Sequence, residues 1–242
     1  MNDSRRKRAL IVGLGGLGCP VASVLARAEN VELWLCDEDL VDASNLHRQL
    51  LYRDQDIGQD KLEAAERTLL AEGVAPERLR LVRSRLLPDN ARQLVREVDV
   101  VIEGADNFAT KFLAADAAHL EARPIVHGAG VRFVATAWAV SAHGAPCYRC
   151  LFEDVPPGAQ AGCSEAGVMA PVVGFCGALM ADLALRVVAG DDSAFGALYT
   201  YDGLCDQLRR VEASPRPACP LCGTSEIVEI DENRYLQPSC AA

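Results

Sequence analysis

Short apolar runs alternate with helical patterns through the first half of the chain. Strands are predicted at residues 9–12, 31–36, 79–82, 98–102 and 124–127. Helices are predicted between them at residues 17–28, 59–71, 89–96 and 107–122. In the second of these helices, one face carries Leu62, Ala65, Leu69 and Leu70. Strands separated by helices predict right-handed βαβ units, and so a Rossmann-like α/β fold with a mainly parallel sheet flanked by helices.

The pattern changes after residue 130. The sequence predicts a strand at 133–140, a loop at 145–162 and a helix at 171–188, with Pro171 near the first turn of that helix. Short strands are predicted at 197–201, 207–212 and 226–230. We therefore expect a C-terminal antiparallel extension on the parallel sheet, within a single domain over residues 1–242.

Composition and charge narrow the possible functions. Half of the 242 residues are hydrophobic, which excludes a mainly disordered chain. The net charge of −10 argues against a general nucleic-acid binder, because phosphate contacts need clustered Lys and Arg. The longest apolar stretch, at 167–181, contains Pro171 and is expected to be a buried helix and not a membrane span. Ten cysteines without a secretion signal predict a reducing, cytoplasmic setting.

A glycine-rich turn follows the first predicted strand. Gly13, Gly15 and Gly18 fit the pattern G-x-G-x-x-G, with Gly16 as an additional glycine. Such a turn lets the backbone approach phosphates at a helix N-terminus, and Asp37 at the end of the second strand is placed to bind ribose hydroxyls. Taken alone, this pattern predicts a nucleotide site, most often for NAD.

The polar residues that follow favour phosphate chemistry over hydride transfer. Asp37 and Asp39 precede a segment with Ser44, Asn45 and Arg48, and Lys61 comes soon after. Nucleotidyl transfer needs cations near the phosphates, whereas hydride transfer needs few. Any one of these charges could instead belong to a solvated loop.

Asp106 and Asn107 follow the fourth predicted strand. Asp106 is a candidate Mg²⁺ ligand, because that cation prefers carboxylate and phosphate oxygens. Either residue could also cap the helix that follows.

Two C-x-x-C pairs, Cys147/Cys150 and Cys219/Cys222, predict a closed four-thiolate zinc site. With 68 residues between the pairs, the site would be a structural clasp; a redox pair or free thiols are the alternatives. Cys19, Cys36 and Cys176 lie in apolar segments and are expected in the core, whereas Cys205 and Cys240 receive no assignment. Cys163, in a glycine-rich loop, is either a nucleophile or an incidental cysteine.

These motifs, in this order, resemble the MoeB/ThiF family, the bacterial relatives of ubiquitin-activating enzymes. The resembling segments are 13–18, 37–49, 58–61, 106–107, 163–174 and the two cysteine pairs. The resemblance implies ATP-dependent adenylation of the C-terminal glycine carboxylate of a small ubiquitin-like β-grasp sulfur carrier. The activated carrier would serve sulfur transfer in molybdopterin, thiamine or related cofactor biosynthesis. It also implies a nucleotide-binding half at 9–130 and a partner-binding, zinc-containing half at 131–242.

The resemblance assigns roles residue by residue. The nucleotide site would comprise Gly13, Gly15, Gly16, Gly18, Asp37, Asp39, Ser44, Asn45, Arg48, Lys61, Asp106 and Asn107. Arg48, Lys61 and Asp106 would be catalytic, with Asp106 holding Mg²⁺, and Cys163 aligns with a loop cysteine that some members use to accept the acyl group or sulfur. The four paired cysteines would bind Zn²⁺. The implied partners are a carrier ending in Gly-Gly, a separate sulfur donor and a second copy of the chain, with neither nucleic acid nor membrane.

Two departures from the family pattern leave alternatives open. Family members carry an arginine ahead of the first strand that reaches the partner subunit's nucleotide site. Here either Arg5, Arg6 or Arg8 substitutes for it, or the start is truncated, or activity is weakened. The family's Gly-Gln after the strand-five arginine is Ala135-Thr136. A catalytically weak scaffold that binds nucleotide and a β-grasp partner is therefore the second hypothesis. An NAD-dependent oxidoreductase, the third, explains only the glycine turn and Asp37.

Overall fold

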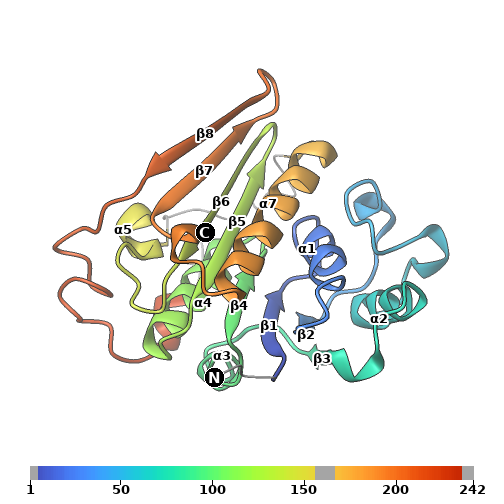
Figure 1. The fold of residues 1–242 in the computed structure, drawn as a ribbon, viewed down its shortest axis with the longest axis horizontal. Coiled ribbons are helices and arrows are strands. Elements are labelled where there is room, and N and C mark those ends of the chain that lie inside the picture. The colour runs from blue at the N-terminus through green and yellow to red at the C-terminus, as the bar shows by residue number, and fades with distance from the viewer. Residues whose placement is uncertain (1–4, 156–166, 236–242) are drawn as a thin grey trace, which may run out of the picture.

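The computed structural model describes residues 5–155 and 167–235, which build one eight-stranded sheet flanked by helices (Figure 1). The strand order is β3-β2-β1-β4-β5-β6-β7-β8. The strands are β1 (Lys7–Val12), β2 (Val31–Asp37), β3 (Leu79–Arg83), β4 (Val100–Glu103), β5 (Ile125–Val131), β6 (Val134–Val140), β7 (Ala197–Asp202) and β8 (Gln207–Glu212). Strands β1 to β5 are parallel, and β5 to β8 pair antiparallel, so both parts of the predicted sheet are confirmed.

Helices cover both faces of the sheet. They are α1 (Gly18–Leu25), α2 (Lys61–Ala71), α3 (Ala91–Arg96), α4 (Phe108–Leu120), α5 (Tyr148–Phe152) and α7 (Ala170–Val188). Helices α1, α2 and α7 pack on one face, and α3, α4 and α5 on the other. Strand β1 shows why: Ala9 and Ile11 join the first core, and Leu10 joins the second. Alternate side chains of a strand point to opposite faces, so a strand buried on both sides is apolar throughout.

The topology creates a crevice beside β1. After β1 the chain proceeds through α1 to β2 and on to β3, and then returns to place β4 on the other side of β1. Because the connections leave β1 and β4 in opposite directions, the carboxyl ends of these strands are left uncovered. Ligands of open α/β sheets bind at such a switch point.

Helix α7 lies in close contact with its neighbours. A Cβ on Gly177 would lie 2.3 Å from Cγ of Pro20 on α1, and a Cβ on Gly128 of β5 would lie 2.1 Å from Sδ of Met180. By length and composition α7 could cross a membrane, but here it packs on α1 and on the sheet. The predicted helix is confirmed, and it continues past the apolar stretch to Val188.

Three local predictions are wrong. Residues 226–230 form no strand: the N–H of Ile227 donates to Pro220 O at 2.9 Å, and Val228 is 67% exposed. The predicted loop at 145–162 contains the short helix α5, whereas 156–162 lie outside the described residues. On α2, Leu70 is exposed and Ala64 is buried, so the buried face is rotated by part of a turn from the predicted one.

Candidate functional site

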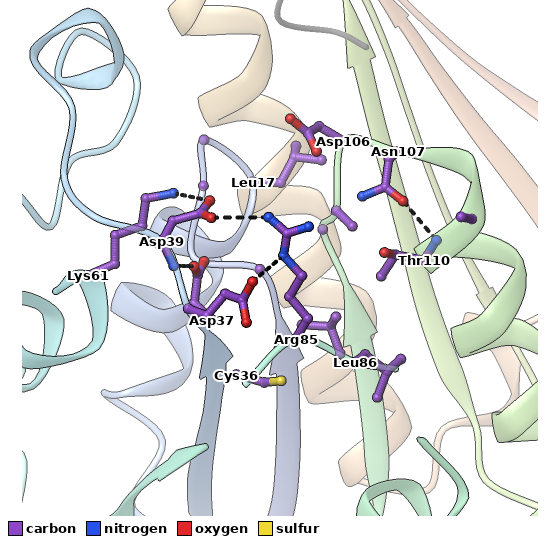
Figure 2. Close-up of a pocket in the computed structure, with 18 of the residues that line it drawn as sticks. Leu17, Cys36, Asp37, Asp39, Lys61, Arg85, Leu86, Asp106, Asn107 and Thr110 are labelled. Carbon is purple, nitrogen blue, oxygen red and sulfur yellow. Dashed lines mark hydrogen bonds and ion pairs between the residues drawn. The ribbon is translucent and has the colours of Figure 1, made fainter. Parts of the chain in front are cut away.

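A cavity of about 760 Å³ lies at the carboxyl ends of β1, β2 and β4 (Figure 2). It brings together residues that are widely separated in the sequence. The predicted nucleotide-site residues that line it are Gly13, Gly15, Gly16, Asp37, Asp39, Asn45, Arg48, Lys61, Asp106 and Asn107. A cavity of this size with convergent polar groups is typical of a small-molecule site.

The glycine turn between β1 and α1 forms the floor of the cavity. Gly13 has a φ of +85°, and a Cβ on Gly18 would lie 1.9 Å from Gly13 O, so a side chain at Gly18 would break the turn. A Cβ on Gly16 would lie 2.8 Å from Val173 Cγ1 and 3.3 Å from Arg48. The turn leads directly into α1, whose N-terminal end attracts phosphate through its N–H groups and its dipole.

Asp37 holds this turn in place. Its carboxylate is only 8% exposed, and Oδ2 accepts a hydrogen bond from Leu14 N–H at 2.6 Å while Oδ1 accepts one from Asp39 N–H at 2.8 Å. Each carboxylate oxygen has a second lone pair, so both remain able to accept a ribose hydroxyl. Asp37 thus couples the shape of the phosphate turn to the place where a ribose would bind.

Two cationic side chains face the cavity, Lys61 with an acidic partner and Arg48 without one among the described residues. Lys61 is the first residue of α2, and its Nζ lies 2.9 Å from Asp39 Oδ2 while its N–H donates to Asp39 O at 3.0 Å. The Arg48 guanidinium donates to Ser44 O at 3.3 Å and to Asn45 Oδ1. Within the described part of the chain no carboxylate pairs with Arg48. The cavity therefore carries uncompensated positive charge at Arg48, which suits a phosphate oxygen.

Two predicted residues are not brought to the cavity wall. Gly18 lies beneath the turn, where its role is steric. The Ser44 hydroxyl donates to Asp42 Oδ1 at 2.5 Å, and its exposed side chain is outside the lining. Arg5, which pairs with Asp99 at 2.9 Å, and Arg8 are also remote from this chain's own cavity, because they lie at the amino end of β1.

The acidic residue after β4 is exposed toward the cavity (Figure 2). The Asp106 carboxylate makes no hydrogen bond or ion pair within residues 5–155 and 167–235, which leaves its oxygens available to a cation. Asn107 both lines the cavity and caps α4, since its Oδ1 accepts the N–H of Thr110 at 2.8 Å. Asn107 therefore serves as the helix cap that the sequence allowed and also lines the cavity.

Arg85, Glu232 and Tyr235 are among the cavity residues that escaped the sequence prediction. Arg85 lies 2.7 Å from Glu38 and 3.6 Å from Asp39. Its position two residues after β3, at the same sheet edge as Asp37, was the signal that could have identified it. Glu232 and Tyr235 reach the cavity from a 3₁₀ turn near the C-terminus, and no local pattern marks them.

A buried ionic network supports the end of β4. Glu103 is fully buried and accepts hydrogen bonds from Lys111 Nζ at 3.0 Å, from Ala105 N–H at 2.6 Å and from His127 Nδ1 at 3.2 Å. Burial raises the pKa of Glu103, but Lys111 and His127 bring it below its usual value, so Glu103 is ionised. Burial lowers the pKa of His127. This network fixes the loop that carries Asp106, because the loop's backbone donates to Glu103.

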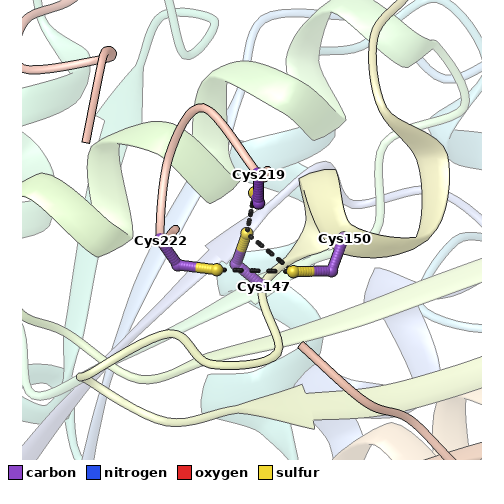
Figure 3. Close-up of side chains that lie close together, drawn as sticks. All are labelled: Cys147, Cys150, Cys219 and Cys222. Carbon is purple, nitrogen blue, oxygen red and sulfur yellow. Dashed lines mark hydrogen bonds between the residues drawn. The ribbon is translucent and has the colours of Figure 1, made fainter. Parts of the chain in front are cut away.

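The four paired cysteines converge on one point (Figure 3). All four Sγ atoms lie within 4.8 Å of one another, with 3.5 Å between Cys147 and Cys219 and 3.3 Å between Cys150 and Cys222. A tetrahedral zinc site with Zn–S bonds of about 2.3 Å places its sulfurs about 3.8 Å apart, so the residues fit a zinc ion. Burial raises the pKa of Cys219, but hydrogen bonds from the N–H groups of Cys222 and Leu221 lower it to about 7.

The other cysteines divide as the sequence indicated. Cys19, Cys36 and Cys176 are buried, and burial raises the pKa of each thiol to about 12, so these thiols stay protonated in the core. Cys205 is exposed. Cys163, the candidate acceptor, lies outside the described residues, as does Cys240.

A second buried ion pair joins the cysteine cluster to α4. Arg149, between Cys147 and Cys150, is 1% exposed, and its Nε and Nη2 each lie 2.8 Å from a carboxylate oxygen of Asp116. The Tyr235 hydroxyl donates to the same carboxylate at 2.7 Å. The cysteine cluster, helix α4 and the C-terminal turn are therefore held by one carboxylate.

Comparison with known proteins agrees with this arrangement. The ThiF family model matches residues 1–221. The chain is 40% identical over 230 residues to a sulfur carrier protein adenylyltransferase of Thermus thermophilus, which covers 91% of this chain and 84% of that protein. It is 35% identical to the SAMP-activating enzyme E1 of Haloferax volcanii, covering 97% of this chain and 86% of that protein.

Two further matches are a longer relative and a solved structure. The chain is 38% identical to the adenylyltransferase and sulfurtransferase MOCS3 of Mus musculus, covering 90% of this chain but only 48% of that protein. The crystal structure of Escherichia coli MccB with ATP superposes with a TM-score of 0.76 at 19% identity, covering 90% of this chain and 68% of that chain, which shows a shared fold alone. By the family model and by its relatives above 30% identity, the chain belongs to the ThiF family.

Proposed function

We propose that this protein is an ATP-dependent adenylyltransferase that activates the C-terminal glycine carboxylate of a small ubiquitin-like sulfur carrier. The observation that carries the proposal is the cavity itself, in which the glycine turn, Arg48, Lys61 and Asp106 converge at the topological switch point. The printed names of the relatives, a sulfur carrier protein adenylyltransferase and a SAMP-activating enzyme, support the same reaction.

The chemistry needs positioning and charge stabilisation. The carrier's carboxylate is already ionised, so it attacks the α-phosphorus without a general base; a bond forms between carboxylate oxygen and phosphorus, and the bond to pyrophosphate breaks. Arg48, which has no acidic partner among the described residues, stabilises the charge on the phosphate oxygens. Lys61, held by Asp39, is the second cation that lines the cavity. Binding both substrates in one cavity supplies the orientation.

The two metal ions are assigned from the side chains available to bind them. The exposed Asp106 carboxylate suits Mg²⁺, which neutralises triphosphate charge when bound. The four thiols suit Zn²⁺ and stand away from the cavity, so this ion would be structural. The carrier is expected to end in Gly-Gly, and the sulfur donor is expected to be a separate protein. We place the enzyme in the cytoplasm as a homodimer; a Cβ on Gly174 of α7 would meet no atom within 4 Å, which leaves room there for close helix packing.

ATP–pyrophosphate exchange tests the proposal. Purified protein is assayed with candidate β-grasp proteins ending in Gly-Gly, as wild type, Arg48→Ala, Lys61→Ala and Arg27→Ala. Arg27 is the matched control, because it follows the C-terminal end of α1, its side chain is 76% exposed and it does not line the cavity. We expect carrier-dependent exchange in the wild type and the control, and loss of exchange by at least about a hundredfold in the two cavity variants, with unchanged circular dichroism.

The other outcomes identify the other functions. Wild-type exchange rates in Arg48→Ala or Lys61→Ala would overturn the assigned roles. ATP binding without exchange, for every carrier tested, would instead establish the scaffold. Tighter binding of NAD than of ATP would point to an oxidoreductase.

A further inference from the structure

The cavity has a polar end and an apolar end, and the apolar end is completed by the C-terminal turn. The glycine turn, Arg48 and Lys61 mark the end for phosphates, and Asp37 marks the ribose. Beyond Asp37 and the ion pair between Arg85 and Glu38, the lining includes the apolar residues Leu86, Leu87, Pro88, Ala109 and Leu113. Glu232 and Tyr235 lie at this end, against α4. An apolar slot with a few polar groups is what a purine base requires.

The turn at Glu232–Tyr235 aims two side chains the same way. In a 3₁₀ turn, residues i and i+3 lie on one face, so Glu232 and Tyr235 both line the cavity. The Tyr235 ring is 6% exposed and its hydroxyl is fixed by Asp116 at 2.7 Å. Asp116 is in turn held by Arg149 from the cysteine loop. A hydrogen bond to a fully buried carboxylate thus fixes the position of the turn.

Glu232 itself is a free acceptor. Its carboxylate is exposed and forms no hydrogen bond or ion pair with any residue in 5–155 or 167–235. An unpaired carboxylate at the edge of an apolar slot can accept a hydrogen bond from a donor on the ligand. On adenine the donor at the base edge is the exocyclic 6-amino group.

We propose that Glu232–Tyr235 forms the base-facing wall of the nucleotide site, with Tyr235 as its apolar surface and Glu232 as the acceptor for the 6-amino group of adenine. The assignment rests on the proposed function for the identity of the nucleotide. The wall lies beyond residue 221, where the match to the family model ends. Glu232 is accordingly a specificity-determining residue, and Arg149 and Asp116 are positioning residues.

The test removes, singly and together, the two groups of the proposed hydrogen bond: the 6-amino group of the nucleotide and the carboxylate of Glu232. Binding of ATP and of purine riboside triphosphate, which lacks the 6-amino group, is measured by calorimetry for wild type, Glu232→Ala and Glu229→Ala. Glu229 is a matched control, an exposed glutamate three residues away that does not line the cavity. We expect wild type to prefer ATP by about tenfold, Glu232→Ala to lose that preference by weakening ATP alone, and Glu229→Ala to keep it.

The results separate this inference from the proposed function. An unchanged preference for ATP in Glu232→Ala overturns the inference, as does tighter binding of GTP than of ATP by the wild type. A lost preference in Glu232→Ala, in a protein that shows no pyrophosphate exchange with any carrier, supports the wall and overturns the adenylyltransferase. Failure of the wild type to bind either purine triphosphate overturns both.

Discussion

Replacing Asp116 by Asn measures what the buried ion pair between α4 and the cysteine loop contributes to stability. The Asp116 carboxylate is 0% exposed and accepts two hydrogen bonds of 2.8 Å from Arg149, whose side chain is 2% exposed. Asn keeps the shape but removes the negative charge, which leaves the guanidinium buried without its main partner. Removing one partner of a buried pair costs about 3–5 kcal/mol, a large part of the roughly 5–15 kcal/mol that stabilises a typical domain.

The control for this change is Asp154→Asn. Asp154 contacts the same guanidinium at 3.2 Å but is 71% exposed, so its loss should cost about 1 kcal/mol or less. The free energy of unfolding of both variants is measured by urea titration, with zinc content determined in parallel. Equal losses in the two variants would refute the argument that burial sets the value of this pair.

Two further predictions concern the cavity floor and the network beneath it. Gly18→Ala should abolish ATP binding and lower the free energy of unfolding by about 1–3 kcal/mol, because the added Cβ would lie 1.9 Å from Gly13 O. Gly15→Ala should fold normally, because the atom nearest to its Cβ would be 3.8 Å away. Calorimetry of ATP binding and thermal melts compare the two variants, and equal behaviour would contradict the steric explanation. The free energy of unfolding should fall as pH drops below 6.5, because the unfolded chain takes up a proton on His127 that the native state, with its lowered pKa, does not. His127→Gln should remove part of this slope in urea titrations between pH 8 and 5, and an unchanged slope would show that His127 does not cause it.

Much of the fold follows from periodicity. The parallel strands and their helices were predicted within a few residues, because buried strands are apolar throughout and helices show one apolar face. The strand expected at 226–230 did not form: Ile227 is buried and Ile230 partly buried against the core that contains Cys147 and Cys219, whereas Val228 is exposed. The short helix α5 was missed, since five residues are too few to show helical periodicity.

The site was predicted where its residues follow a strand. Asp37 is the last residue of β2, and Gly16 and Asp106 lie within four residues of the ends of β1 and β4; strand ends of a parallel sheet meet at one edge. Glu232 and Tyr235 reach the same cavity from the other end of the chain, through contacts with α4. No local pattern encodes such a contact, because it depends on tertiary packing. Ser44 was included by its place in a motif, yet its hydroxyl is occupied by Asp42.

The position of the cysteine cluster also bears on the order in which the chain is completed during synthesis. Strands β1 to β5 and their helices emerge from the ribosome first, and N-terminal parts of a protein generally fold first. Cys147 and Cys150 emerge with them but wait for Cys219 and Cys222, and Tyr235 follows later still. A nascent chain therefore has its phosphate turn before Glu232 and Tyr235, and the four cysteines can meet only after Cys222 has been synthesised.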